Sequence, residues 1–173
     1  MIRRIATVCA GGVAAVAVVA VTQFHAQAAA PHAAKTYNMY VTLYGALDND
    51  PPGSADIAYP TLHDEAGGTG TYSDPITFAT DKSELKPGTK VYYSYLKKYF
   101  IMEDDCAECD SDWGHKYRHI DLWAGNSNDS RILACEDSLT QDGQVPVIVN
   151  PASNLTVSKT PIFDPKTKKC YKP

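Results

Sequence analysis

The sequence predicts an all-β domain in which long loops separate short strands. Its apolar runs are short and rich in Val, Ile, Tyr and Thr, the residues that favour strands. Turn-forming residues are frequent, with 11 glycines and 11 prolines. No segment carries an extended helical repeat, so helices are expected only as short segments. This combination is typical of a barrel or a sandwich.

The first thirty residues are interpreted as a secretory signal peptide. Arg3 and Arg4 form a positive start, residues 5–21 form an apolar run, and Ala26-Gln27-Ala28 offers a small-residue cleavage site. A membrane anchor is the alternative, but the run is short for a spanning helix. We therefore expect one secreted domain, residues 31–173, with no membrane attachment after cleavage.

The first half of this domain is expected to form strands around two flexible loops. Glycine- and proline-rich sequence at residues 48–53 and 66–75 predicts the loops. The second loop lacks the lysine and the following helix of a phosphate-binding loop. The expected strands and the apolar run between them are residues 36–44, 76–79, 90–96 and 99–102, with the last two paired.

The second half is expected to add two strands and one ambiguous element. Residues 119–123 and 145–149 have strand composition, and Pro146 predicts that the second of these begins at a sheet edge. Residues 132–139 fit either a strand or a short helix. No repeat or long linker divides the region, so one domain is predicted.

The charge balance argues against nucleic acid and anionic lipid as partners. The full chain has a formal net charge of −4, and loss of the two arginines with the signal brings it to −6. An acidic secreted protein tolerates neutral or cationic polymers better than polyanions. We expect it to act as a monomer.

The cysteines are predicted to form two disulfides. Cys9 leaves with the signal, and an even number remains in an oxidising compartment: Cys106, Cys109, Cys135 and Cys170. The three possible pairings stay open. A zinc site is the alternative for the Cys-x-x-Cys pair, but only one such pair is present, and we expect no metal and no cofactor. Calcium bound by the acidic residues around Glu108 is weighed against a merely solvated loop, which is preferred.

Four segments resemble the core of the double-psi β-barrel proteins. Their order matches the shared pattern of expansins, barwin, cerato-platanins, rare lipoprotein A and family 45 endoglucanases. The segments are Val41-Thr42-Leu43-Tyr44-Gly45, Leu85-Lys86-Pro87-Gly88-Thr89, Phe100-Ile101-Met102-Glu103-Asp104-Asp105-Cys106 and His119-Ile120-Asp121-Leu122. The resemblance implies a six-stranded double-psi β-barrel with a polysaccharide-binding groove. It also departs from the family, since Gly45 and Ala46 stand where family 45 endoglucanases place a base aspartate. Asp48 and Asp50 are the nearest candidates.

Asp121 and Asp105 are the predicted catalytic carboxylates. Asp121 lies between Ile120 and Leu122, so on a strand it points to the opposite face. The resemblance implies that Asp121 is a general acid and that Asp105 lies near it across the groove. Two close carboxylates hold one proton more tightly, which suits proton transfer. The alternatives are structural: a loop-capping Asp121 and an Asp105 that orders the turn at Cys106.

Hydroxyl, imidazole and aromatic side chains are predicted to hold the glycan, because aromatic faces bury the C–H faces of sugars. Trp113 is expected to be an exposed platform in a polar loop, while core packing is the alternative for most aromatic residues. The predicted binding residues are Thr42, Tyr44, Tyr72, Trp113, His119 and Trp123.

Three functions follow from these observations. The first is a secreted, expansin-like protein that binds and loosens or cleaves cell-wall polysaccharide of the cellulose, chitin or peptidoglycan class. If it is an enzyme, it is a glycoside hydrolase or lytic transglycosylase with Asp121 as the acid. The second is a non-catalytic glycan-binding module, and the third is a protein-binding barrel of the inhibitor or defence type. The fold alone does not choose among them.

Overall fold

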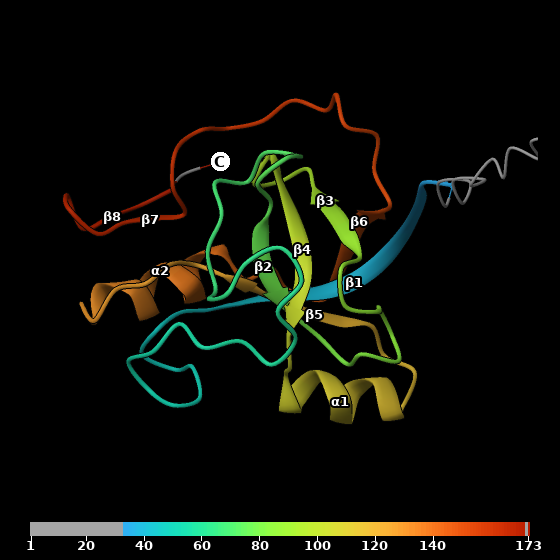
Figure 1. Ribbon diagram of the computed structural model, residues 1–173, viewed down its shortest axis with the longest axis horizontal. Coiled ribbons are helices and arrows are strands. Elements are labelled where there is room, and N and C mark those ends of the chain that lie inside the picture. Colours follow the sequence, from blue (N-terminus) through green and yellow to red (C-terminus); the bar gives the residue numbers. More distant parts are fainter. Residues whose placement is uncertain (1–32, 172) are drawn as a thin grey trace, which may run out of the picture. The chain divides into compact units, whose positions relative to one another are not determined.

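A closed barrel forms the centre of the molecule. The computed structural model describes residues 33–171 and Pro173, so the expected signal peptide lies outside the described residues. Six strands close in the order β1-β5-β2-β4-β3-β6 (Figure 1). The strands are β1 (Lys35–Tyr44), β2 (Ile76–Ala79), β3 (Lys90–Tyr93), β4 (Lys98–Asp104), β5 (His119–Trp123) and β6 (Gln144–Val149). The prediction of an all-β, six-stranded barrel with long loops and short helices is confirmed.

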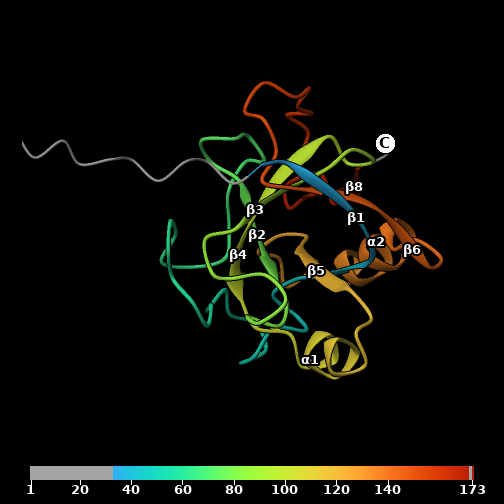
Figure 2. The ribbon, with the colours of Figure 1, turned by 90° about the vertical axis from the view of Figure 1, so that its right-hand side faces the viewer.

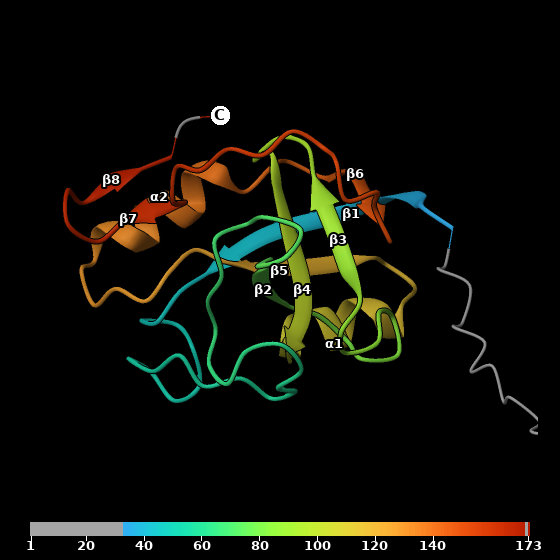
Figure 3. The ribbon, with the colours of Figure 1, turned by 45° about the horizontal axis from the view of Figure 1, so that its top comes forward.

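The barrel mixes parallel and antiparallel pairs. β1 is parallel to β5 and β2 is parallel to β4, and the remaining neighbours are antiparallel. Figure 3 shows the long strand β1 passing behind β3 and β4. Pro146 pairs with β1, whereas β3 reaches β6 only at Ile148 and Val149. Pro146 therefore lies where β6 has a neighbour on one side only, as a residue without an N–H requires.

The core follows from strand alternation. Val41 and Leu43 of β1 lie opposite Ile120 and Leu122 of β5, and all four side chains are buried. The residues between them point outward from the barrel wall, because successive side chains on a strand alternate in direction. The outward set on β1 and β5 forms the floor of the candidate site.

Two short helices and a small hairpin complete the fold: α1 (Ala107–Gly114), α2 (Arg131–Leu139), and β7 (Phe163–Asp164) with β8 (Lys169–Cys170). α2 resolves the ambiguity at residues 132–139 in favour of a helix. α1 was not predicted, since its eight residues are mostly polar and only Cys109 is buried. Figure 2 shows α1 at the end of the barrel reached by the connection between β1 and β2.

Both predicted disulfides are present. Cys106 pairs with Cys109, and Cys135 of α2 pairs with Cys170 of β8. The second bond fastens the C-terminal segment to α2 across 35 residues of sequence. Disulfides persist in oxidising compartments, which agrees with the expected environment of the protein. Within residues 33–171, no helix is long and apolar enough to cross a membrane.

Candidate functional site

An open, acidic cleft of about 750 Å³ lies on the outer wall of the barrel. Its floor is made by outward side chains of β1, β2 and β5, and its walls by the loop after β1 and by the junction of β4 with α1. Seven of its lining residues are acidic, and no lysine or arginine is among the described residues that line it. The acidic residues are Asp48, Asp50, Asp56, Asp104, Asp105, Glu108 and Asp121. Such a cleft repels polyanions and suits a neutral or cationic ligand.

The floor is a ladder of paired side chains. The parallel register of β1 and β5 sets Tyr40 opposite His119 and Thr42 opposite Asp121. Tyr40 packs on the His119 ring with centroids 4.8 Å apart, and Thr42 Oγ1 donates to Asp121 Oδ1 at 2.7 Å. Ala79 of β2 lies opposite Asp121 on the other side. Its small side chain leaves Asp121 open to the cleft.

A β-bulge brings a second carboxylate to this floor. Phe78 of β2 lies opposite Met102 of β4, but the next residue, Ala79, lies opposite Asp104. Glu103 is therefore the extra residue, and a bulge of this kind changes the direction in which the following side chain points. Asp104 and Asp121 both flank Ala79, so two strand spacings of about 4.8 Å each separate their backbones.

Asp104 is nevertheless held more tightly than Asp121. It is buried, and it accepts hydrogen bonds from the Tyr44 hydroxyl at 2.7 Å, from Ala58 N at 3.0 Å and from Asp105 N at 2.9 Å. Burial raises its pKa above the ordinary value despite these bonds. Burial and the adjacent Asp104 also raise the pKa of Tyr44. Tyr44 and Asp104 therefore form a fixed part of the wall.

Asp121 combines burial of its carboxyl group with access to the cleft. Burial raises its pKa to about 7, against the lowering effect of the Thr42 hydrogen bond. The charges of Asp48, Glu108 and Asp104 raise it further. A carboxylic acid with this pKa still carries its proton in weakly acidic solution and can donate it to a leaving oxygen.

A chain of three hydrogen bonds runs from Asp121 along the cleft floor to Asp112 of α1. Beyond the Thr42–Asp121 bond, Thr42 Oγ1 lies 2.8 Å from His119 Nε2, and His119 Nδ1 lies 2.9 Å from Asp112 Oδ2. His119 is buried, and burial lowers its pKa more than Asp112 raises it. His119 is therefore neutral near neutral pH. It can accept a hydrogen bond at one ring nitrogen and donate a hydrogen bond from the other.

The predicted partner Asp105 shares the cleft but lies at its exposed rim. Its Oδ1 accepts from the Tyr59 hydroxyl at 2.6 Å, which raises the pKa of Tyr59 to about 12. Asp48, Glu108 and Asp104 are the charges that act on the pKa of Asp121, and Asp105 is not among the leading ones. Asp105 and Asp121 thus line one cleft, and the bulge adds a carboxylate that was not predicted, Asp104, beside the floor.

Gly45 lets the start of the wall approach α2 closely. A Cβ at this position would lie 2.5 Å from Glu136 Oε1 and 2.8 Å from the Ile132 side chain. The Gly45 N–H donates to Asp48 Oδ1 at 2.8 Å, which holds Asp48 at the edge of the cleft. The departure from the endoglucanase pattern at Gly45 thus leaves a carboxylate, Asp48, three residues later in the cleft.

Three of the predicted binding residues lie outside the cleft. Tyr72 lies in the loop before β2 and packs against Tyr99 of β4. The Lys90 ammonium lies over the Tyr72 ring. Trp123 is 3% exposed because its ring packs edge-on against Tyr44. The expectation that Tyr72 and Trp123 line the groove with Asp121 is therefore corrected.

Trp113 also differs from its predicted role. It belongs to α1 rather than to a loop, and it is half-buried. Its Nε1 donates to Ser83 Oγ at 3.0 Å, and the cations of Lys116 and Arg118 lie 4.6 and 5.1 Å from its ring. Trp113 does not line the cleft.

Sequence reasoning missed Tyr40 as the aromatic residue of the cleft. Tyr40 precedes Thr42 by two positions, so the alternation that placed Thr42 outward also places Tyr40 outward. It is partly exposed beside His119. Thr42, Tyr44 and His119 line the cleft as predicted.

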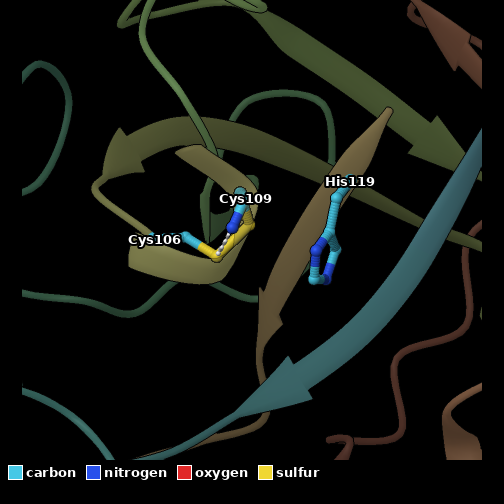
Figure 4. Close-up of side chains that lie close together, drawn as sticks. All are labelled: Cys106, Cys109 and His119. Atoms are coloured by element: carbon cyan, nitrogen blue, oxygen red, sulfur yellow. Dashed lines mark hydrogen bonds between the residues drawn. A yellow bond between two sulfur atoms is a disulfide. The ribbon is translucent and has the colours of Figure 1, made fainter. Parts of the chain in front are cut away.

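Cys106, Cys109 and His119 form a cluster behind the wall. Figure 4 shows the disulfide and the His119 ring facing each other, and one potential ligand atom from each residue lies within 4.8 Å of the others. The two sulfurs are bonded to each other, so they do not offer the thiolates that a metal requires. Cys106 Sγ instead accepts from Cys109 N at 3.1 Å and caps the N-terminus of α1.

The fold and site define a class: a small barrel with one open carboxylate-lined cleft on its outer wall. Residues 36–171 match the family model described as the DDB_G0273701 N-terminal domain, and the chain belongs to this family. The matched range contains all six barrel strands except the first residue of β1, together with the whole cleft.

A relative in Dictyostelium discoideum, "Uncharacterized protein DDB_G0273701/DDB_G0273221", is 46% identical over 135 residues. The match covers 76% of this chain and 59% of the relative, so the chain spans little more than half of the relative's length. No solved structure matches the chain. These names state no activity, and the function is therefore argued from the cleft.

Proposed function

We propose that this protein is secreted and acts on a neutral or amino-sugar polysaccharide of the cell-wall type, which it binds in the cleft and cleaves with Asp121 as general acid. The observation that carries the proposal is Asp121, with a pKa of about 7 on the floor of an open cleft. With seven acidic residues and no lysine or arginine in the described lining, the cleft disfavours phosphorylated or sulfated ligands. The resemblance of the strand motifs to double-psi β-barrel proteins supports the same substrate class.

Each part of the cleft has a role in this proposal. Asp121 protonates the glycosidic oxygen as the bond to it breaks. Asp48 is exposed at the edge, and its charge is the largest acting on Asp121, so it would act as the base that activates water. Tyr40 would contact the apolar face of a sugar ring. Asp104 is fully hydrogen-bonded and would orient Tyr44 rather than move protons.

Binding without cleavage is the second candidate function. The loops that form the walls are long and Asp105 lies at their rim, which favours ligand contact independent of Asp121 chemistry. In that case Tyr40→Ala weakens binding while Asp121→Asn does not. A protein-binding barrel predicts neither effect on any glycan.

The test is incubation with cellulose, chitin, xylan and peptidoglycan, scoring both co-sedimentation and released sugars. We expect Asp121→Asn to abolish release and keep binding, and Asp48→Asn to lower release strongly. Trp113→Ala is the matched control, since Trp113 is aromatic but lies outside the cleft. Retention on none of the four polymers would reject both glycan functions, and products from Asp121→Asn at the wild-type rate would reject the acid.

A further inference from the structure

We propose that His119 and Asp112 are positioning residues that orient one directional chain of hydrogen bonds, from Asp121 to Thr42 to His119 to Asp112, and thereby hold the proton on Asp121. The inference rests on the proposed function only in naming Asp121 the acid. The chain itself is a property of four described side chains in the free protein, joined by contacts of 2.7, 2.8 and 2.9 Å.

Counting protons fixes the direction. Thr42 has one hydroxyl proton, so it can donate to Asp121 or to His119 but not to both. A carboxylate such as that of Asp112 only accepts hydrogen bonds, which selects the His119 tautomer with its proton on Nδ1. The bare Nε2 then accepts from Thr42, and the Thr42 oxygen accepts from a protonated Asp121. All three links are satisfied in this arrangement. Donation from Thr42 to Asp121 belongs to the ionised carboxylate.

Loss of the acid proton leaves one link without a proton. When Asp121 is ionised, the Thr42 hydroxyl turns and donates its hydrogen bond to the Asp121 carboxylate. Thr42 Oγ1 and His119 Nε2 then face each other at 2.8 Å as two acceptors. Because His119 is buried, water cannot readily repair the link, and a buried group without a partner is unfavourable. The far end of the chain thus favours the protonated acid.

During the proposed cleavage the Asp121 proton moves to the leaving oxygen, as the bond from that oxygen to the sugar breaks. The Thr42 hydroxyl turns toward the new carboxylate. Water bonds to the sugar carbon in place of the leaving oxygen and gives one proton to Asp48, which releases it to solvent. Asp121 then takes one proton from solvent and the Thr42 hydroxyl turns back to His119, so that one water is consumed and charge balances over one cycle. His119 and Asp112 touch no substrate in this scheme and act through Thr42.

A rival arrangement has the same number of protons. In it Asp121 is ionised, and His119 is an imidazolium that donates to both Thr42 and Asp112. In this rival state Asp121 is negative and His119 is positive, whereas both groups are neutral in the proposed state. Burial of His119 disfavours the charged pair. The neighbouring acidic groups favour an added proton in this hydrogen-bonded chain, whether the proton is on Asp121 or on His119. The charged and titratable groups around the chain are Asp48, Asp104, Glu108, Glu84 with its partner Arg118, Tyr40 and Tyr44.

Nuclear magnetic resonance of the free protein tests the direction of the chain. We expect the His119 ring nitrogens to report a neutral Nδ1–H tautomer at about pH 5.5, where an ordinary histidine is mostly protonated. An imidazolium or an Nε2–H tautomer at that pH overturns the proposal. No substrate is involved, so this result is independent of whether the protein cleaves glycans.

A double-mutant cycle tests the coupling, with the carboxyl ¹³C shift of Asp121 as the readout. Asp112→Asn removes the charge that selects Nδ1–H, and we expect the pKa of Asp121 to fall by about one unit. In a Thr42→Val background, which breaks the chain, the same change should shift the pKa by less than half as much. Glu108→Gln is the control: it removes an acidic charge from the same helix outside the chain and should act equally in both backgrounds.

The two failures are distinguishable. An Asp112→Asn shift that is absent, or that is the same size with valine at position 42, overturns the chain and leaves Asp121 free to act as the proposed acid. A positive cycle with no released sugar from any polymer supports the chain and rejects the proposed cleavage.

Discussion

Two carboxylate–histidine networks lie on the outer wall of this barrel, and they place their protons oppositely. In the first, His63 lies directly between Glu103 and Asp74, with Nδ1 2.7 Å from Glu103 Oε2 and Nε2 3.1 Å from Asp74 Oδ1. In the second, the Thr42 hydroxyl separates His119 from Asp121. The first network fastens a loop, and the second opens into the cleft.

The number of donors explains the difference. Glu103 Oε1 accepts from the backbone N–H groups of Thr61, Leu62 and His63 and from the Thr61 hydroxyl. Burial alone would raise the pKa of Glu103, but these bonds and His63 lower it below the ordinary value. The same contacts raise the pKa of His63 despite its burial. With His63 protonated, this network is an ion pair in which every carboxylate oxygen has a hydrogen-bond partner.

An ionised Asp121 has one donor among the described residues, the Thr42 hydroxyl, whereas Glu103 has five besides the His63 ring. Its pKa therefore rises with burial, and the pKa of His119 falls. Each site combines a carboxyl group with a histidine. The result is a structural carboxylate at Glu103 and a protonated acid at Asp121. The donor count, rather than burial, decides which of the two results.

Replacement of Glu103 by glutamine should have the largest effect. The change keeps the size of the side chain but removes the buried charge that accepts from five donors and from His63. We expect a loss of about 3 kcal/mol in the free energy of unfolding near pH 7, because one partner of a largely buried pair is lost. Urea unfolding followed by tryptophan fluorescence measures it. Asp105 is an exposed carboxylate two residues further along the chain. Asp105→Asn should change the free energy of unfolding by less than about 0.5 kcal/mol.

Glu136→Gln should have the opposite sign. Burial, together with Asp48 and Asp121, raises the pKa of Glu136 to about 8, and its Oε1 has no hydrogen-bond partner. A raised pKa means that the folded state binds the proton more tightly. Its stability contribution is complete below the ordinary pKa and lost as pH rises through 8. The amide cannot ionise, so the variant should gain roughly 2 kcal/mol over wild type at pH 9. Equal unfolding curves at pH 9 would show that Glu136 is ionised at little cost.

Asp121→Asn should behave in the same way with a smaller amplitude. Its pKa of about 7 means that its stability contribution, complete at pH 4, is lost as pH rises through 7. Because part of Asp121 is open to the cleft, we expect a gain of only about 1 kcal/mol at pH 8 and little change at pH 5. Unfolding at the two pH values, compared with Glu103→Gln, tests the comparison directly. A loss at pH 8 similar to that of Glu103→Gln would mean that both networks are ion pairs.

Much of the barrel could be predicted from sequence because strand periodicity is local. The alternation in residues 119–123 placed Asp121 on the face opposite Ile120 and Leu122, and the family resemblance assigned Thr42 to the same groove. That Thr42 pairs with Asp121 came only from the register of the strands. The predicted strand at residues 90–96 ends early in β3, where the chain turns and Lys97 adopts a positive φ of 52°. Such a turn leaves no alternation signal.

The rest of the site depends on contacts that no local pattern encodes. The bulge at Glu103 exists only relative to β2, so the choice between Asp104 and Asp105 required the register. The exposure of Trp113 and Tyr72 depended on which partners the fold brought to their rings, namely Ser83 and Tyr99. The donors to Glu103 come from residues 26 to 42 positions away in the chain.

The smallest expected effect is at Asp74, the outer end of the structural network. Its side chain is 43% exposed. Unlike Asp112, it does not set the tautomer of its histidine alone, because His63 also contacts Glu103 at the shorter distance of 2.7 Å. The raised pKa of His63 means that its contribution is complete below its ordinary value of 6.5 and is lost as pH rises through the folded-state pKa. Asp74→Asn should lower the pKa of His63 and reduce stability at pH 5.5 by about 0.5 kcal/mol, with no difference at pH 8.5. Histidine titration by magnetic resonance and urea unfolding at both pH values measure it. A loss of equal size at the two pH values would assign the role of Asp74 to its bonds with the Thr69 backbone and not to His63.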